Sequence, residues 1–375
     1  MPGLLEYLYG NASSHWGAQR IADGHAAPYS AKIVFICSNE EPQQHCSGKP
    51  PYPPLAPGEK DFQCYISAFT KWAAATKGAA IELGVWPLTV GVALDSGAGR
   101  FFSPGSEDRY RGGASEMIQA IVQADLGPVL WDQHGDGGVA AGWGDGRDWQ
   151  ALLSNVPPSS QSMEALTKAA GKWVKTIMLE ENGGGCGLSR ALGHVSNSLS
   201  FQRFGHQMVA QSAAGMMWSG PQGAKNGDYQ IKWLADRIVK APYWYSQQML
   251  SESHQPNVVG GFHRLFNDSS SSQIAGGRKT FVDWMAAVSD DGRTLVIRTE
   301  NPNAAPVAFK ATLDGGPWGA RAAVRTLAAS SLDAVNDYDT PTAVAPKNST
   351  AAVVGSVLAA ALPPFSFVTL TLTKA

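Results

Sequence analysis

Short apolar runs alternate with amphipathic stretches over roughly the first two-thirds of this chain. The apolar runs lie at 33–36, 88–94, 129–131 and 177–179, and each precedes a stretch whose apolar residues recur at helical spacing. Alternation of strand and helix predicts a parallel sheet with right-handed crossovers. We count about five such βα units. The last predicted helix has the apolar stripe Ile231, Leu234, Ala235, Ile238 and Val239.

The pattern changes near residue 254. The short runs Thr294–Arg298 and Val368–Leu372 are typical of strands, and Asn-Pro, Gly-Gly and Pro-Pro turns separate such runs. We therefore expect an α/β part followed by an all-β part. The predicted domains are a parallel-sheet domain over residues 1–253 and an antiparallel β-sandwich over residues 254–375.

Composition argues against several classes of partner. The net charge is −2, the pI is near 6.4, and no block of basic residues occurs. We therefore expect no nucleic-acid partner and no anionic membrane surface. No apolar run reaches the length of a membrane span. The sequence has no Walker loop, HExxH or GxSxG motif, and no motif requires a metal or an organic cofactor.

The cysteines and three Asn-X-Ser/Thr triplets give information on the cellular location of the protein. The four cysteines show no CxxC spacing, so zinc is not indicated, and Cys46 and Cys64 flank a Pro-rich loop and could form a disulfide. Asn11-Ala-Ser13, Asn267-Asp-Ser269 and Asn348-Ser-Thr350 are glycosylation acceptors in a protein that meets the secretory pathway. These triplets favour an extracellular or secretory location.

Acidic residues follow two of the predicted strands. Asn39-Glu40 comes after the run 33–36, and Glu180-Glu181 comes directly after the run 177–179. The carboxyl ends of parallel barrel strands meet at the catalytic mouth, and a glycosidase places two carboxylates on either side of the bond that it cleaves. The pattern therefore predicts glycosidase chemistry.

Spaced motifs support that prediction over most of the chain. Near the start stand Trp16-Gly17, Arg20, Gly24-His25 and Pro28-Tyr29, leading to Asn39-Glu40. Further motifs are Tyr243 with Met249, Ser251 and Glu252, then Asn301-Pro302, Val335-Asn336 with Pro341, and Leu362-Pro363-Pro364-Phe365-Ser366. Together they resemble the α-L-arabinofuranosidases of glycoside hydrolase family 51.

The resemblance implies a role for each acidic residue. Glu40 matches the general acid/base, and Asn39 matches the residue that hydrogen-bonds the sugar hydroxyl next to the anomeric carbon. Glu181 matches the nucleophile best. Because Asn182 stands where the family usually has an aromatic residue, Glu180 remains a competitor for that role. The acid that is not the nucleophile would orient its neighbour.

Three further residues are candidates for the sugar pocket. His134 matches a family histidine that lines the pocket, although Gly135-Asp136 follows it instead of aromatic residues. Trp131 and Trp218 are candidate walls of the pocket, as is Asp132; all three could equally be packing residues. Ser38 replaces a glycine before the acid/base, which puts the shape of the pocket in doubt.

The opening residues Leu4-Leu5-Glu6-Tyr7 resemble a helix near the middle of the family's barrel. The resemblance thus implies a partial (β/α)8 TIM barrel, about its last five βα units, followed by the β-sandwich. The implied function is a retaining glycosidase that removes α-L-arabinofuranosyl residues from arabinose-containing oligo- or polysaccharides, with oligomer formation possible. The alternative is a catalytically inactive, truncated fragment or a carbohydrate-binding remnant. With the first units absent, we expect the chain alone to be poorly active and unstable.

Overall fold

A computed structural model gives the fold of the chain in two compact units. It describes residues 2–36, 61–93, 119–120, 122–125, 129–132, 174–181, 186–203, 208–213, 217–219, 230–234, 237–260, 264–265 and 281–375. Unit 1 comprises Met1–Gly137, Pro157–Glu180 and His206–Ser212, and unit 2 comprises Gly138–Val156, Glu181–Gly205 and Ala213–Ala375. These units do not test the predicted domain boundary at residue 253, which stays a prediction.

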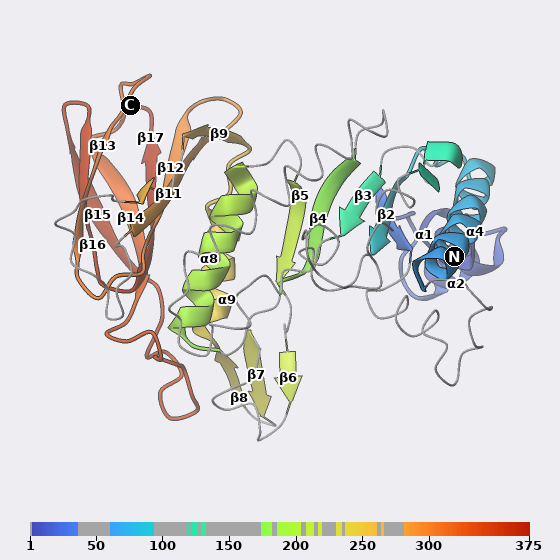
Figure 1. Cartoon of the computed structure of the whole chain (residues 1–375), viewed down its shortest axis with the longest axis horizontal. Helices are drawn as coiled ribbons and strands as arrows, with labels where there is room; N and C mark the ends of the chain where they lie inside the picture. The colour runs from blue at the N-terminus through green and yellow to red at the C-terminus, as the bar shows by residue number, and fades with distance from the viewer. Residues whose placement is uncertain are drawn as a thin grey trace. The chain divides into compact units, whose positions relative to one another are not determined.

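The sheet of unit 1 has five strands in the order of the chain (Figure 1). They are β1 (Ile33–Ile36), β2 (Thr89–Ala93), β3 (Val129–Asp132), β4 (Val174–Glu181) and β5 (Met208–Ala213). The pairs β1–β2, β2–β3 and β3–β4 are parallel. Sequential order without a reversal is the winding of a barrel rather than that of a doubly wound sheet. The first four strands lie at the apolar runs, as the sequence predicts, and β4 extends to include Glu180 and Glu181.

Helices α1 (Pro2–Tyr9) and α4 (Asp61–Glu82) pack with one face of this sheet. Leu5 of α1, Ala80 of α4, Val34 of β1 and Leu88 form one buried cluster. Helix α2 (His15–Ala22) begins after Ser14, whose hydroxyl accepts a hydrogen bond from the Gly17 N–H. The helix predicted near 62–76 is confirmed and continues to Glu82.

Unit 2 contains an antiparallel sheet of nine strands, which confirms the predicted change of pattern (Figure 1). Eight strands follow the order β10-β11-β12-β17-β14-β15-β16-β13, and β9 pairs with β11. The strands are β9 (Asn257–Gly260), β10 (Arg264–Leu265), β11 (Phe281–Val288), β12 (Thr294–Asn301), β13 (Val307–Thr312), β14 (Arg321–Ala328), β15 (Lys347–Val354), β16 (Val357–Leu362) and β17 (Ser366–Thr373).

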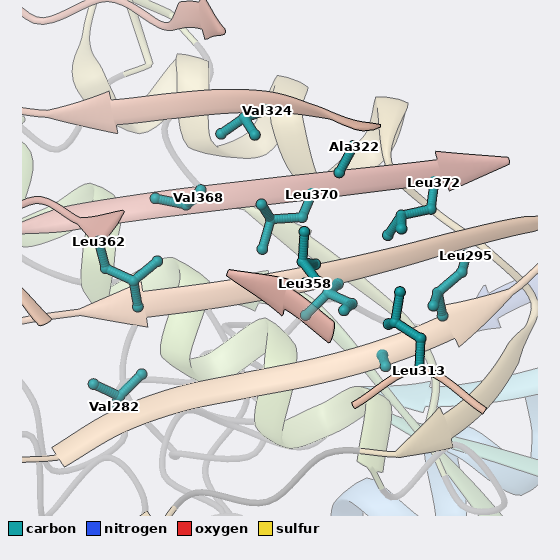
Figure 2. Close-up of a cluster of buried hydrophobic side chains, with 12 residues drawn as sticks. Val282, Leu295, Leu313, Ala322, Val324, Leu358, Leu362, Val368, Leu370 and Leu372 are labelled. Carbon is teal, nitrogen blue, oxygen red and sulfur yellow. The ribbon is translucent and has the colours of Figure 1, made fainter. Parts of the chain in front are cut away.

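Strand alternation gives this sheet two apolar faces. On one face Leu295, Val368, Leu370 and Leu372 meet Leu358 and the other residues of the sandwich core (Figure 2). On the opposite face Met285, Leu327 and Phe367 pack with α8 (Leu188–Arg203) and α9 (Pro242–Glu252). Both helices are therefore part of the same compact unit as the strands. Helix α8 confirms the helix predicted near 188–205.

The prediction of a last helix over 231–239 is wrong. Residues Ile231–Leu234 form β7 and Arg237–Lys240 form β8, an antiparallel pair, and β7 also pairs in parallel with β6 (Met217–Ser219). In this hairpin Val239 is buried, whereas Ile238 is 64% exposed, so the apolar residues do not form one buried helical stripe. Pairing with β6 supplies backbone partners, and β-branched residues are suited to strands.

Candidate functional site

The parallel sheet brings the ends of its strands to one edge. β1 ends at Ile36, three residues before Asn39, and β3 and β4 end at Asp132 and Glu181. Because neighbouring strands run in the same direction, their carboxyl ends share this edge, where ligands bind in sheets of this kind. Asn39, Glu40 and His134 themselves lie outside the described residues, as does Cys46, which could pair with Cys64.

The register of the strands distinguishes the two faces of the sheet. Val34 lies on the face that α1 and α4 cover. Phe35, Gly91 and Leu130 are in register across β1, β2 and β3, so they share the opposite face. The ring of Phe35 crosses over Gly91, where an added Cβ would lie 2.2 Å from a ring atom. The absence of a side chain at position 91 therefore leaves room for the Phe35 ring.

The same register separates the two candidate nucleophiles by their strand positions. Asp132 is the partner of Ile177, and β4 continues for four residues beyond Ile177 to Glu181. The two-residue repeat of a strand assigns positions 177, 179 and 181 to one face and positions 178 and 180 to the other. Glu181 thus occupies a position on the face opposite the helices, and Glu180 a position on the helix-covered face.

Strand positions also bear on the aromatic candidates. Trp131 pairs with Val92 and Thr176, positions on the same face of the sheet as Val34. Its neighbour Asp132 occupies the face of Leu130 and Ile177. Strand alternation places positions 131 and 132 on opposite faces of the sheet, but the sequence does not indicate which face the helices cover.

Trp218 belongs to the small sheet of unit 2. Its register partner in β7 is Lys232. Lys232 is buried, and its Nζ lies 4.5 Å from the centre of the Tyr338 ring. The sugar-binding roles of Trp131 and Trp218 stay predictions.

The motif upstream of Asn39-Glu40 contains a buried arginine that joins the segments before β1. The side chain of Arg20 is buried; its Nε donates to the His25 carbonyl at 3.0 Å, and its Nη1 donates to the carbonyls of Tyr7 at 2.9 Å and Gly10 at 2.8 Å. One guanidinium thus ties α1, the turn after it and the segment after α2. Gly24 has a φ of +96°, which a glycine adopts readily. Arg20 and Gly24 therefore have structural roles.

The motifs near the end of the chain are also structural. Asn301 Nδ2 donates to the carbonyls of Pro363 at 2.8 Å and Leu362 at 3.3 Å, which joins the Asn301-Pro302 motif to the Leu362–Ser366 motif. Asn336 Nδ2 donates to the Lys240 and Val344 carbonyls at 2.8 and 2.9 Å, and its Oδ1 accepts from the Val344 N–H. The sequence motifs include Asn301 and Asn336, but they do not predict the hydrogen bonds by which these residues close loops.

Tyr243, another residue of the sequence motifs, takes part in a buried polar cluster in unit 2. The Nη2 of Arg190 on α8 donates to the Tyr243 hydroxyl at 2.9 Å, and the His194 ring meets the Tyr243 ring edge-on at 5.0 Å. All three side chains are buried.

No set of three or more His, Cys, Asp or Glu residues suited to a metal ion occurs in the part of the chain that the structure describes. None of its described helices is long and apolar enough to cross a membrane.

Models of known protein families give no match to this chain, and no curated protein matches its sequence. Solved structures do match its fold. An α-L-arabinofuranosidase from Thermotoga maritima, in complex with arabinose, has a TM-score of 0.65 at 15% identity, over 99% of this chain and 72% of that one. A family 51 α-L-arabinofuranosidase from Bifidobacterium longum has a TM-score of 0.66 at 15% identity, over 98% and 72% of the two chains.

A bifunctional glucanase-xylanase from a metagenome library is similar at a lower TM-score of 0.55, with 14% identity over 100% of this chain and 68% of that one. At these identities the likeness establishes the fold alone. The chain has the fold of glycoside hydrolases, and the arabinofuranosidases named above match it better than the glucanase-xylanase does. This agrees with the expected partial barrel followed by a β-sandwich.

Proposed function

We propose that this chain is a retaining glycosidase that removes α-L-arabinofuranosyl residues from arabinose-containing polysaccharides. One observation carries the proposal: the strand that leads to Asn39-Glu40 and the strand that ends in Glu180-Glu181 are members of one sequential parallel sheet. Their carboxyl ends therefore share an edge, as two catalytic carboxylates require. The fold shared with arabinofuranosidases supports the choice of sugar.

The proposed reaction is a double displacement. The Glu181 carboxylate attacks the anomeric carbon while Glu40 donates a proton to the departing oxygen, which gives a covalent arabinosyl-enzyme. Glu40 then takes a proton from water as the water attacks the same carbon and releases Glu181. Such a mechanism needs carboxyl groups about 5–5.5 Å apart.

The remaining candidates have supporting roles in this proposal. Asn39 would hydrogen-bond the hydroxyl next to the anomeric carbon, and His134 would line the sugar pocket. Glu180 would orient Glu181 from the adjacent position. Strand alternation supports Glu181 over Glu180 as the nucleophile, since it assigns Glu181 to the face opposite the helices.

The decisive experiment measures hydrolysis of an aryl α-L-arabinofuranoside by the purified chain. Aryl β-glucosides and β-xylosides are run in parallel, because a glucanase-xylanase shares the fold. We expect slow turnover of the arabinofuranoside and none of the other two substrates, and loss of that turnover in Glu181→Gln. A slow glycosyl donor with an activated leaving group should label Glu181, which peptide mass spectrometry would locate.

The competing function is a carbohydrate-binding remnant without catalysis. The departure at Asn182, where the resemblance leads us to expect an aromatic residue, is the observation that favours it. Binding of arabino-oligosaccharides by calorimetry, with no turnover and no covalent label, would replace our proposal with this one. Turnover of a glucoside or xyloside instead would keep the glycosidase and change its substrate.

A further inference from the structure

Strand β15 has an open edge at the surface of unit 2. Residues 347–352 pair with β14 on one side, whereas β16 pairs only with Val353 and Val354. No strand in the part of the chain that the structure describes pairs with the other edge of 347–352. The strand reads Lys-Asn-Ser-Thr-Ala-Ala-Val-Val, in which Lys347 is the single charged residue. An exposed edge of this kind invites pairing with another chain unless something blocks it.

The same strand has one of the three glycosylation triplets. Ala351 and Val353 pack against the sandwich core, so strand alternation directs Asn348 and Thr350 to the other face. Both are exposed. The amide and the hydroxyl of the triplet therefore share one face with Arg325, the register partner of Asn348; α8 and α9 cover this face at Leu327 and Phe367 but leave Asn348 and Thr350 exposed.

We propose that Asn348 is an N-glycosylation site and that its glycan covers the open edge of β15. The proposal is independent of the glycosidase activity and rests on passage of the chain through the secretory pathway. A bulky, hydrated glycan would do what charged residues do on other edge strands, namely prevent edge-to-edge pairing.

The modification is a glycosyl transfer from a lipid pyrophosphate-linked oligosaccharide, catalysed by the transferase of that pathway. The Asn348 Nδ2 forms a bond to the anomeric carbon of the first sugar, and the bond from that carbon to the pyrophosphate oxygen breaks. The lipid pyrophosphate leaves with the bonding electrons, and one amide proton passes to a base of the transferase.

Asn11 is the other acceptor among the described residues. Its Oδ1 accepts hydrogen bonds from the Ser13 N–H at 2.9 Å and the Ser13 hydroxyl at 2.5 Å in the exposed turn before α2. A test of Asn348 therefore uses the full chain with Asn11→Gln and Asn267→Gln, so that one acceptor remains. An acceptor triplet in a carboxyl-terminal tag reports whether the chain met the transferase.

The chain is secreted from a eukaryotic host, and peptides are analysed by mass spectrometry before and after enzymatic release of N-glycans in water labelled with oxygen-18. We expect a glycan at Asn348 that Thr350→Ala abolishes and Thr350→Ser retains. An unmodified Asn348 beside a modified tag would overturn the site.

The shielding role has its own readout. On light scattering the Thr350→Ala protein should associate, whereas Thr350→Lys, which also lacks the glycan but adds a charge to the edge, should remain monomeric. Equal behaviour of the glycosylated chain and Thr350→Ala would overturn the shielding role, even if Asn348 carries a glycan.

Discussion

Asp132 at the end of β3 is the register partner of Ile177 in β4, and this pairing fixes the strand positions of the two acids at the end of β4. Counting from Ile177, strand alternation assigns Glu181 to the face of Asp132 and Glu180 to the face that the helices cover at β1. Glu180 and Glu181, which the sequence alone leaves as competitors, thus have strand positions on opposite faces of the sheet.

Glu181→Gln should therefore lower turnover of an aryl arabinofuranoside far more than Glu180→Gln does. Removal of one residue of a covalent catalytic unit costs about 10⁴-fold or more in kcat, whereas loss of an orienting neighbour costs much less. The Glu40 and Glu181 carboxyls should lie about 5–5.5 Å apart in a crystal structure. A larger loss in Glu180→Gln, or a separation beyond roughly 9 Å with Glu180 closer, would transfer the nucleophile role to Glu180.

Glu40→Gln should be most harmful with poor leaving groups. General acid catalysis contributes about 10²–10⁴-fold, but a leaving group of low pKa departs with little protonation. Initial rates across aryl arabinofuranosides of graded leaving-group pKa measure this dependence. An equal loss for activated and unactivated substrates would remove Glu40 from the acid role.

Gly91→Ala should destabilise the sheet of unit 1. The added methyl group would lie 2.2 Å from the Phe35 ring, which must then move, and overpacking of this kind costs about 1–3 kcal/mol. Gly78→Ala in α4 is the matched control, because no atom lies within 4 Å of its Cβ position and alanine favours a helix by about 0.5–1 kcal/mol. Thermal melts should move in opposite directions, and a neutral Gly91→Ala would contradict the packing of Phe35.

Asn301→Asp should destabilise unit 2 more than Asn301→Ala. The Asn301 amide donates to the carbonyls of Ala305, Leu362 and Pro363, and each buried hydrogen bond contributes about 0.5–1.5 kcal/mol. A buried carboxylate cannot donate to these carbonyls, so its charge would face their oxygen atoms. Asn257→Ala, at an exposed residue, serves as the control in urea unfolding. The reverse order of the two Asn301 variants would exclude a donor role.

Arg298→Ala should cost about 2–5 kcal/mol in the free energy of unfolding, through lost hydrogen bonds and a cavity. The Nε of Arg298 donates to the Ser253 hydroxyl at 3.0 Å, and Nη2 donates to the Leu250 carbonyl at the end of α9. Burial lowers the pKa of Arg298 to about 10. Arg325→Ala is the control, since its ion pair with Glu252 is half-exposed and should contribute no more than about 1 kcal/mol. Similar melting temperatures for both variants would contradict the buried role.

The sequence predicts the strands of unit 1 well because each is a short apolar run bounded by a helical stretch. β1 to β4 and α8 lie where their patterns place them, and Glu180-Glu181 ends β4. The spacing of the apolar residues from Ile231 to Val239 predicts a helix, but this segment forms strands because β6, β7 and β8 pair with one another. A local pattern cannot include the backbone hydrogen bonds that β6 offers to β7.

The sequence by itself determined the alternation of strand and helix, the change to antiparallel strands, and the two acids at the end of β4, because each is a local pattern of apolar and polar residues. Tertiary structure alone decided which face of the sheet the helices cover at β1. It also decided that Asn301 meets Pro363. Faces and distant pairs depend on how elements pack in three dimensions, and the spacing of residues along the chain does not specify that packing.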